Sequence, residues 1–316
     1  MRSARWRLAP PAAAEPAVAA PSARSWALER YGVAFALEPH APGFHVPALK
    51  AAGKAVGTST PVLVLPPQSP PGSPPRLLLD SAAILRWVDA QAPPSAPKLF
   101  PPAAAQVEAL CARFDSGIGV AARSFVYAHA LDTHEMAAAL APPTVPAPER
   151  FLWRYAGVGY AVRKLMRAGM AISLDNGARA LDELRSEFAA VSALLSDGRQ
   201  YLAGDAAGFT AADLTFAALA APALGVAYGT HPPWAMLQEL PRALRDAAEE
   251  LRATPAGRLA LRLWDEERAR VVGGVLRWCA QPVTQHSAAP RRSLGVSGGA
   301  SSLAVTPRRR AASGAA

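Results

Sequence analysis

The chain has 316 residues, of which 51% are hydrophobic, and its formal net charge is +9. This length suits roughly one to three domains and is sufficient to bury a sizeable core. No uncharged apolar run reaches the about 18 residues that indicate a transmembrane helix. We therefore expect a protein without a membrane span.

The positive charge is concentrated at the two ends of the chain. Residues 1–24 have a net charge of +3, and residues 281–316 contain five arginines and no acidic residue. Residues 25–280 therefore carry only +1 in total. A nucleic-acid-binding protein is expected to carry a basic patch on its folded domain, so the charge distribution argues against a nucleic-acid partner.

Both ends also have the composition of segments outside a folded domain. Residues 1–24 are rich in Ala, Pro and Arg, which suits a disordered leader, an organelle transit peptide or an incorrectly assigned first exon. Residues 281–316 are rich in Ser, Gly, Ala and Arg without periodicity, which predicts a disordered basic tail. The expected location is the cytoplasm, or a chloroplast or mitochondrion if the leader is a transit peptide.

Residues 25–92 show the patterns of a mixed α/β domain. Helices and strands are indicated by apolar periodicity, by glycine and proline stops and by continuously apolar runs. In chain order, the pattern predicts a helix from Ser25 to Gly32, a strand over Val33–Leu37, a short helix within His40–Gly53, a buried strand over Pro61–Leu65, a loop over Pro66–Pro75, a strand over Leu77–Leu79 and a helix over Ser81–Ala90. Before the first helix only Ala17–Ala20 is strand-like, so a first strand is expected to be weak or missing.

After a linker at residues 93–102, residues 103–280 have only helical patterns. No strand pattern follows residue 90, which predicts an all-helical second domain. The expected helices are Ala103–Leu131 with a possible break near Gly117–Gly119, Phe151–Met170, Ala178–Ser196, one that starts at Thr210, Leu240–Leu251 and Ala256–Arg270.

The two cysteines suggest neither a disulfide framework nor a metal site. Cys111 lies in a helical pattern with Leu110, Phe114 and Ile118, which favours a buried thiol. Cys279 follows Trp278 near the end of the periodic region and has no assigned role. The histidines do not show a metal-ligand spacing either, so no metal is expected.

Two short motifs lie at the starts of a predicted strand and a predicted helix. Thr60-Pro61 begins the buried strand, and Asp80-Ser81 opens the helix that follows the next strand. With Ser81 as N-cap, the free N–H groups of that helix and the positive end of its dipole would favour a carboxylate. A trans proline at a strand start and an ordinary helix cap are the alternatives that the residues leave open.

A third motif is structural. Thr210 and Asp213 have the spacing of a capping box, and Phe209 and Leu214 are placed as a hydrophobic staple around it. We expect Thr210 to cap its helix and Asp213 to close the box.

The segments Thr58–Asp89 and Tyr201–Pro222 resemble the glutathione S-transferase (GST) family, and the resemblance covers about residues 22–270. It implies a thioredoxin-like N-terminal domain over residues 25–92 and the all-helical C-terminal domain of that family. It also implies that Pro61 is cis and that the Thr60 backbone binds the cysteinyl part of glutathione. The pair Asp80 and Ser81 would hold the γ-glutamyl end.

The family's thiol-activating residue lies between the first strand and the first helix. The matching position holds Pro21, and Ser22, one residue further, is the nearest hydroxyl. Ser22 is thus a candidate catalytic residue, and a plain loop serine is the alternative. By the same resemblance, Phe125, Tyr127 and Tyr155 would either line an apolar co-substrate pocket or pack in the core.

The resemblance implies glutathione-dependent transfer or thiol exchange on a small hydrophobic electrophile, as in detoxification. Glutathione would be the co-substrate, and a homodimer is possible. Because the activating residue is not evident, a second hypothesis is a non-catalytic GST-like module that binds glutathione, a hydrophobic ligand or a protein partner.

Overall fold

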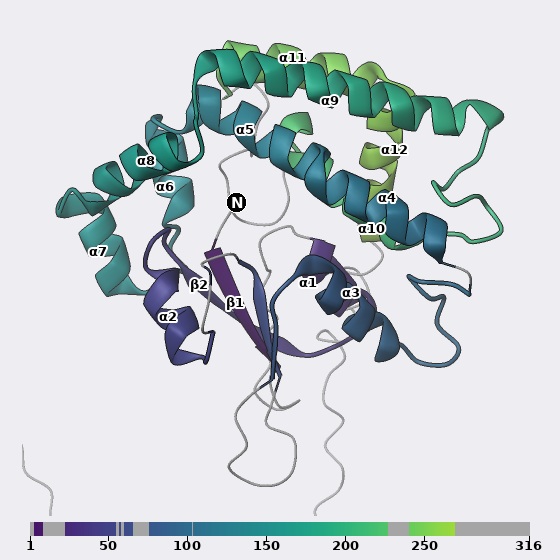
Figure 1. Cartoon of the computed structure of the whole chain (residues 1–316), viewed down its shortest axis with the longest axis horizontal. Helices are drawn as coiled ribbons and strands as arrows, with labels where there is room; N and C mark the ends of the chain where they lie inside the picture. The colour runs from purple at the N-terminus through teal and green to yellow at the C-terminus, as the bar shows by residue number, and fades with distance from the viewer. Residues whose placement is uncertain are drawn as a thin grey trace, which may run out of the picture.

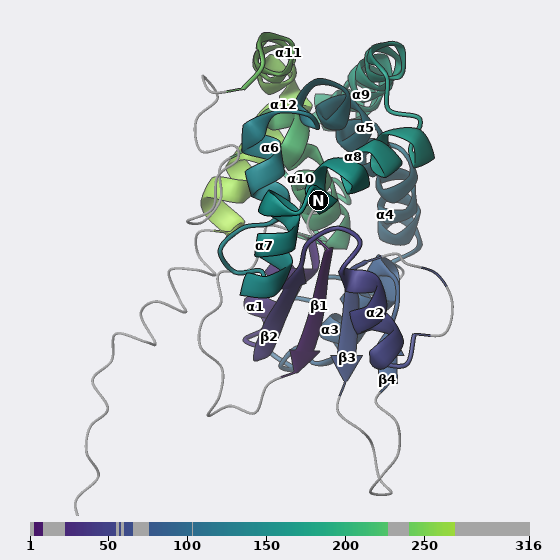
Figure 2. The same cartoon turned by 90° about the vertical axis from the view of Figure 1, so that its left-hand side faces the viewer.

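A computed structural model describes residues 3–8, 23–54, 57, 60–65, 76–102, 104–226 and 240–268. A small sheet with flanking helices is formed by the first part of the chain, and helices form the second part (Figure 1). The helical part lies over one end of the sheet (Figure 2). The predicted change from a mixed α/β region to a helical region is therefore confirmed for the described residues.

The sheet has four strands in the order β2-β1-β3-β4. Strand β1 pairs antiparallel with β2 and parallel with β3, and β3 pairs antiparallel with β4. The strands are β1 (Ser3–Leu8), β2 (Phe35–His40), β3 (Val62–Leu65) and β4 (Arg76–Leu78).

The prediction of a missing first strand is wrong, because Ser3–Leu8 of the predicted leader forms β1. The strand-like residues 17–20 lie outside the described residues. In a strand–helix–strand crossover unit the two strands are parallel, whereas β1 and β2 are antiparallel here. The first unit of the sheet therefore differs from the thioredoxin-like expectation.

The central strand β3 is buried on both faces, as its continuous apolar sequence predicts. Val62 and Val64 pack in a cluster with Leu49 of helix α2 (His45–Ala51). Leu63 and Leu65 belong to the main core, which includes helices α1 (Ala23–Arg30) and α3 (Ser81–Ala90). Alternate residues of one strand thus attach helices to both faces of the sheet.

The linker after α3 is tied to the α/β part by hydrogen bonds. The Leu99 N–H donates to the Asp89 carboxylate at 2.6 Å and to the Tyr31 hydroxyl at 3.1 Å. The Leu99 carbonyl accepts from the N–H of Ala211 at the start of helix α10 (Ala211–Leu224). One linker residue therefore joins α1, α3 and the helical part.

The helical part contains no strand within residues 104–226 and 240–268. The predicted break in the first helix is confirmed at Gly117, and the predicted helix 151–170 is divided at Gly157, whose φ is 70°. The helices are α4 (Ala105–Ser116), α5 (Ile118–Ala130), α6 (His134–Leu140), α7 (Ala147–Tyr155), α8 (Val158–Gly169), α9 (Leu174–Leu194), η1 (Leu195–Asp197), α10 (Ala211–Leu224), α11 (Arg242–Ala253), α12 (Pro255–Leu263) and the π-helical turn η3 (Trp264–Arg268).

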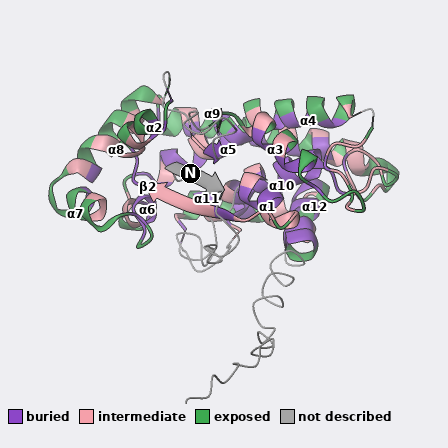
Figure 3. Ribbon diagram, turned by 90° about the horizontal axis from the view of Figure 1, so that it is seen from below, coloured by how far each residue is buried: buried purple, intermediate pink, exposed green. Residues whose placement is uncertain are grey.

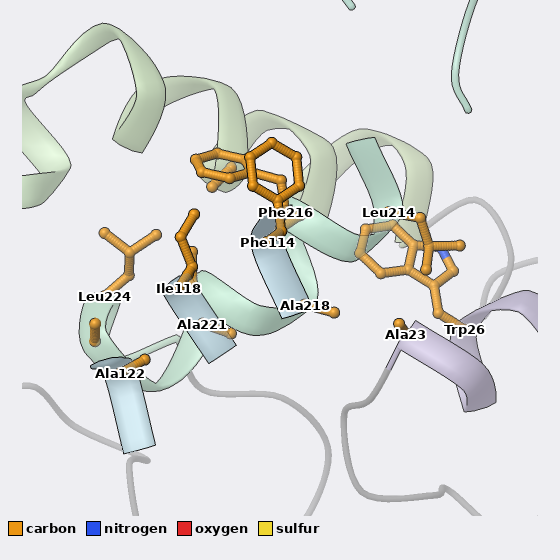
Figure 4. Packing of buried hydrophobic residues seen from close by; sticks show 14 of the residues in the cluster. Ala23, Trp26, Phe114, Ile118, Ala122, Leu214, Phe216, Ala218, Ala221 and Leu224 are labelled. Carbon is orange, nitrogen blue, oxygen red and sulfur yellow. The ribbon is translucent and has the colours of Figure 1, made fainter. Parts of the chain in front are cut away.

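Helix α10 is the centre of the helical core. It is apolar around most of its circumference, as expected of a helix that is covered on all sides, and nearly all its residues are buried. The Phe216 ring lies 5.3 Å from the Phe114 ring and 5.6 Å from the Phe188 ring. Figure 4 shows Phe216 beside Phe114 and Leu224 near Ile118. Trp26 of α1 reaches the same cluster.

The capping box at the start of α10 is present, as predicted. The N–H and the hydroxyl of Thr210 both donate to Asp213 Oδ2, at 2.9 and 2.8 Å. The Leu202 N–H donates to Asp213 Oδ1 at 2.8 Å. Thr210 and Asp213 are fully buried, so both residues have a structural role beneath the loop that precedes α10.

None of the described helices has both the length and the apolar character needed to cross a membrane.

Candidate functional site

The register of the β3–β4 hairpin brings the two predicted ligand motifs together. Leu63 pairs with Leu78 in this antiparallel ladder. Pro61 precedes the paired residues of β3 by two positions, and Asp80 follows those of β4 by two positions, so both lie beyond the same end of the hairpin. The Thr60–Pro61 peptide bond is cis, as predicted. Two motifs about twenty residues apart in sequence therefore meet at the end of the sheet that faces the helical part.

The N-terminus of α3 differs in one detail from the expectation. Asp80, not Ser81, is the N-cap, because the Asp80 carboxylate accepts a hydrogen bond from the Ala83 N–H at 2.7 Å. Ser81 is the first residue of the helix. Its hydroxyl is therefore free of the capping role and lies beside the positive end of the helix dipole.

Arg24, near the start of α1, is the residue at this site that the sequence reasoning missed. Its Nη2 donates a hydrogen bond to Ser81 Oγ. Burial lowers the pKa of Arg24 to about 10, and the charges of Asp115 and Asp80 act in the opposite direction. At neutral pH the guanidinium stays charged, so it adds a cation to the helix N-terminus.

Asp115, in the last turn of α4, belongs to the helical part, and its charge interacts with those of Arg24 and Asp80. Burial raises the pKa of Asp115, the Arg24 charge lowers it, and the Asp80 charge raises it. The cluster of Arg24, Asp80, Ser81 and Asp115 thus combines one cation, one hydroxyl and two acids. Such a set can bind a group that carries both a carboxylate and an ammonium.

Of the remaining candidate residues, three can be placed in the structure and one cannot. Ser22 lies outside the described residues. Phe125 and Tyr127 are buried in the helical core, whereas Tyr155 is 73% exposed on α7. Burial raises the pKa of Tyr127 to about 12, so this hydroxyl stays protonated at neutral pH.

His40, at the end of β2, contacts Glu149 of the helical part in the geometry of an ion pair. Its Nδ1 lies 2.8 Å from Oε1 of Glu149 on α7, and the Ala41 N–H donates to Oε2 of the same carboxylate. The contact fastens the β2–α2 connection to α7. Within the described residues, no group of three or more His, Cys, Asp or Glu side chains could hold a metal ion.

Comparisons of the chain with protein-family models, with curated proteins and with solved structures found no match in any of the three.

Proposed function

We propose that the chain is a GST-like protein that binds glutathione where the cis Thr60–Pro61 bond, the α3 N-terminus and the end of α4 meet. The proposal includes the thioredoxin-like relationship of the N-terminal part, despite the reversed first strand. The observation that carries it is the contact of Arg24 with Ser81 at the start of α3. The charges of Asp115 and Asp80 both act to raise the pKa of Arg24.

This cluster is complementary to the γ-glutamyl end of glutathione, which carries an α-carboxylate and an α-ammonium. The Arg24 guanidinium, the Ser81 hydroxyl and the free N–H groups of α3 would hold the carboxylate. Asp115 and Asp80 would face the ammonium. The backbone of Thr60 would pair with the cysteinyl part as an added strand does.

The reaction would be transfer of the glutathione thiol, or thiol exchange, on a small hydrophobic electrophile. A free thiol with a pKa of about 8.5 is only about 3% ionised at pH 7. Catalysis therefore needs a group that favours the thiolate. Ser22 is the candidate for that role.

A non-catalytic glutathione-binding module is the second candidate, and the direction of β1 favours it. Because β1 runs parallel to β3, its last residue, Leu8, is at the end of the sheet away from Pro61. The end of β1 is therefore not beside the cis proline, where the proposal places the cysteinyl part of glutathione. As a non-catalytic module, the chain would bind glutathione but catalyse little transfer or thiol exchange.

Calorimetry with glutathione, combined with a conjugation assay on the 316-residue chain, tests the proposal. We expect weak binding that falls about tenfold or more in Ser81→Ala, with slow turnover. Ser196→Ala, which removes an exposed serine in the short turn η1 after α9, should bind as the original chain does. Absence of glutathione binding in the original chain would refute both versions.

The same assay separates the two versions. Brisk turnover that disappears in Ser22→Ala, with binding retained, would identify Ser22 as the catalytic hydroxyl. Binding without turnover would support the non-catalytic module.

A further inference from the structure

Large apolar side chains are exposed in one region of the molecule, the arm formed by α7 and α8 (residues 147–169). Tyr155, Leu165, Phe151 and Tyr160 are 73%, 71%, 62% and 59% exposed. Most of the large apolar side chains that are exposed among the described residues lie in this arm or at its end: Phe151, Leu152, Tyr155, Tyr160, Leu165 and Leu174. Figure 3 shows α7 and α8 at one end of the molecule with exposed residues along their outer edge.

The exposed apolar residues follow helical spacing. On α7, Phe151 and Tyr155 are four residues apart, and their rings lie 5.4 Å from each other. On α8, Tyr160 and Lys164 are four residues apart and share a face. Leu165 is also exposed and lies further round the same helix. Both helices therefore expose large apolar side chains to solvent, and on α8 the exposed Lys164 lies between Tyr160 and Leu165 in sequence.

These faces are not the core sides of the two helices, because the opposite sides are already packed. Trp153 of α7 is buried, and its Nε1–H donates to the Ala137 carbonyl at 2.9 Å. Gly159 of α8 lies so close to Trp153 that a Cβ would be 2.6 Å from the Trp153 carbonyl oxygen. The outer faces are thus a second apolar surface on a fully packed arm.

The arm is also basic, although one of its cations, Arg167, forms an ion pair with Asp132 outside the arm. Residues 147–170 contain five cations and one acid, and that acid, Glu149, faces His40. Arg154 is exposed on α7. On α8, the Lys164 ammonium lies 4.9 Å from the centre of the Tyr160 ring.

The charge distinguishes between possible occupants of this surface. A second copy of the chain would bring the same cations against one another, which disfavours self-association through this face. A surface of anionic lipid headgroups is complementary to the cations and can bury the aromatic and leucine side chains at its apolar boundary. The basic residues at both ends of the sequence add attraction of the same sign.

We propose that the α7–α8 arm docks the protein peripherally on a bilayer surface that contains anionic lipids. Phe151, Tyr155, Tyr160 and Leu165 enter the headgroup region, and Arg154 and Lys164 contact the lipid phosphates. This inference is independent of glutathione binding.

Vesicle co-sedimentation of the full chain tests the proposal, with phosphatidylcholine vesicles that either contain or lack phosphatidylglycerol. We expect binding only to the anionic vesicles, and weaker binding as the salt concentration rises. The double variant Tyr160→Ser/Leu165→Ser should bind roughly tenfold or more weakly. Val120→Ser, which removes an exposed apolar side chain of α5, is the matched control and should bind unchanged.

A charge series completes the test. Lys164→Gln and Arg154→Gln should each weaken vesicle binding about fivefold at low salt. Arg242→Gln removes a cation that is 86% exposed on α11 and should have no effect. Vesicle binding that does not change in any arm variant, equal binding to neutral vesicles, or no vesicle binding at all would overturn the proposal. The last result, together with arm-dependent binding to an acidic protein, would indicate a protein partner instead.

Discussion

Glu29 of α1 and Arg268 of η3 form an ion pair in which Glu29 Oε2 lies 2.5 Å from Arg268 Nη2. Their chain neighbours, Arg30 and Glu267, form a second pair at 3.0 Å. The Arg268 guanidinium also lies 5.6 Å from the centre of the Trp26 ring. These contacts fasten the first described helix to the last described turn, so they link the α/β part to the end of the helical part.

Because Arg268 is almost completely buried and Glu29 is largely buried, loss of Glu29 removes an opposite charge from a cation that water can hardly reach. Glu29→Gln should therefore lower the free energy of unfolding by about 3 kcal/mol. Denaturant unfolding followed by circular dichroism measures the change. Arg30→Gln is a useful comparison, because Arg30 also contacts the Phe209 ring at 4.5 Å and tests the neighbouring pair.

A double variant distinguishes charge from packing at this contact. Glu29→Gln combined with Arg268→Met removes both charges and keeps an apolar side chain over Trp26. It should be more stable than Glu29→Gln alone. If the loss of unfolding free energy in the double variant instead equals the sum of the losses in the two single variants, the ion pair does not couple the two residues.

Thr210→Ala should destabilise the chain by about 1–2 kcal/mol, because it removes the N-cap of the central helix α10. Glutathione affinity should not change, since Thr210 belongs to the buried cap and not to the cluster at α3. Denaturant midpoints and calorimetry test the two parts separately. Thr144→Ala, at an exposed turn threonine, is the control. An unchanged midpoint, or lost affinity with retained stability, would show that the structural assignment is wrong.

Asp115→Asn should weaken glutathione binding about fivefold to tenfold, because the amide cannot offer a negative charge to the ligand ammonium. A glutathione analogue that lacks the α-amino group should bind the original chain and Asp115→Asn equally. This comparison assigns a role to one carboxylate without relying on turnover. A similar loss for both ligands would place Asp115 in a general structural role.

The strand start at Pro61 and the helix start at Asp80-Ser81 could be predicted from sequence because they depend on short-range features. The cis form of the Thr60–Pro61 bond was expected only from the family resemblance, because the residues alone equally suit a trans proline at a strand start. The sequence could not show that Asp80, and not Ser81, is the N-cap of α3, because either side chain can cap a helix. Arg24 and Asp115 were missed because their meeting depends on how α1 and α4 pack, which no local pattern specifies.

The first strand was missed for a different reason. Residues 3–8 alternate polar and apolar side chains, with Ser3, Arg5 and Arg7 between Ala4, Trp6 and Leu8. This alternation is typical of a strand, but the surrounding Ala, Pro and Arg composition favoured a leader. The direction of β1 within the sheet is set by long-range pairing with β2 and β3, and the strand's own sequence does not specify it.

The last prediction concerns Cys111, which the sequence indicated as a buried thiol. Its side chain is buried in α4, and the Thr215 hydroxyl donates to Sγ at 3.6 Å. Burial raises the pKa of Cys111 to about 11, and the hydrogen bond from Thr215 opposes part of this rise. Because the thiolate is the reactive form, Cys111 should react slowly with a disulfide reagent at neutral pH.

In a Cys279→Ser variant, where Cys111 is the only thiol, labelling at pH 8 should be roughly a hundredfold slower than for free cysteine, whose pKa is about 8.5. The rate should rise about tenfold for each pH unit between pH 7 and 9, because the thiolate fraction is far from saturation below the raised pKa. Labelling in denaturant should recover the free-cysteine rate and is the control. A native rate that levels off near pH 8.5 would mean that the thiol is exposed, and the packing of α4 against α10 at Thr215 would then be wrong.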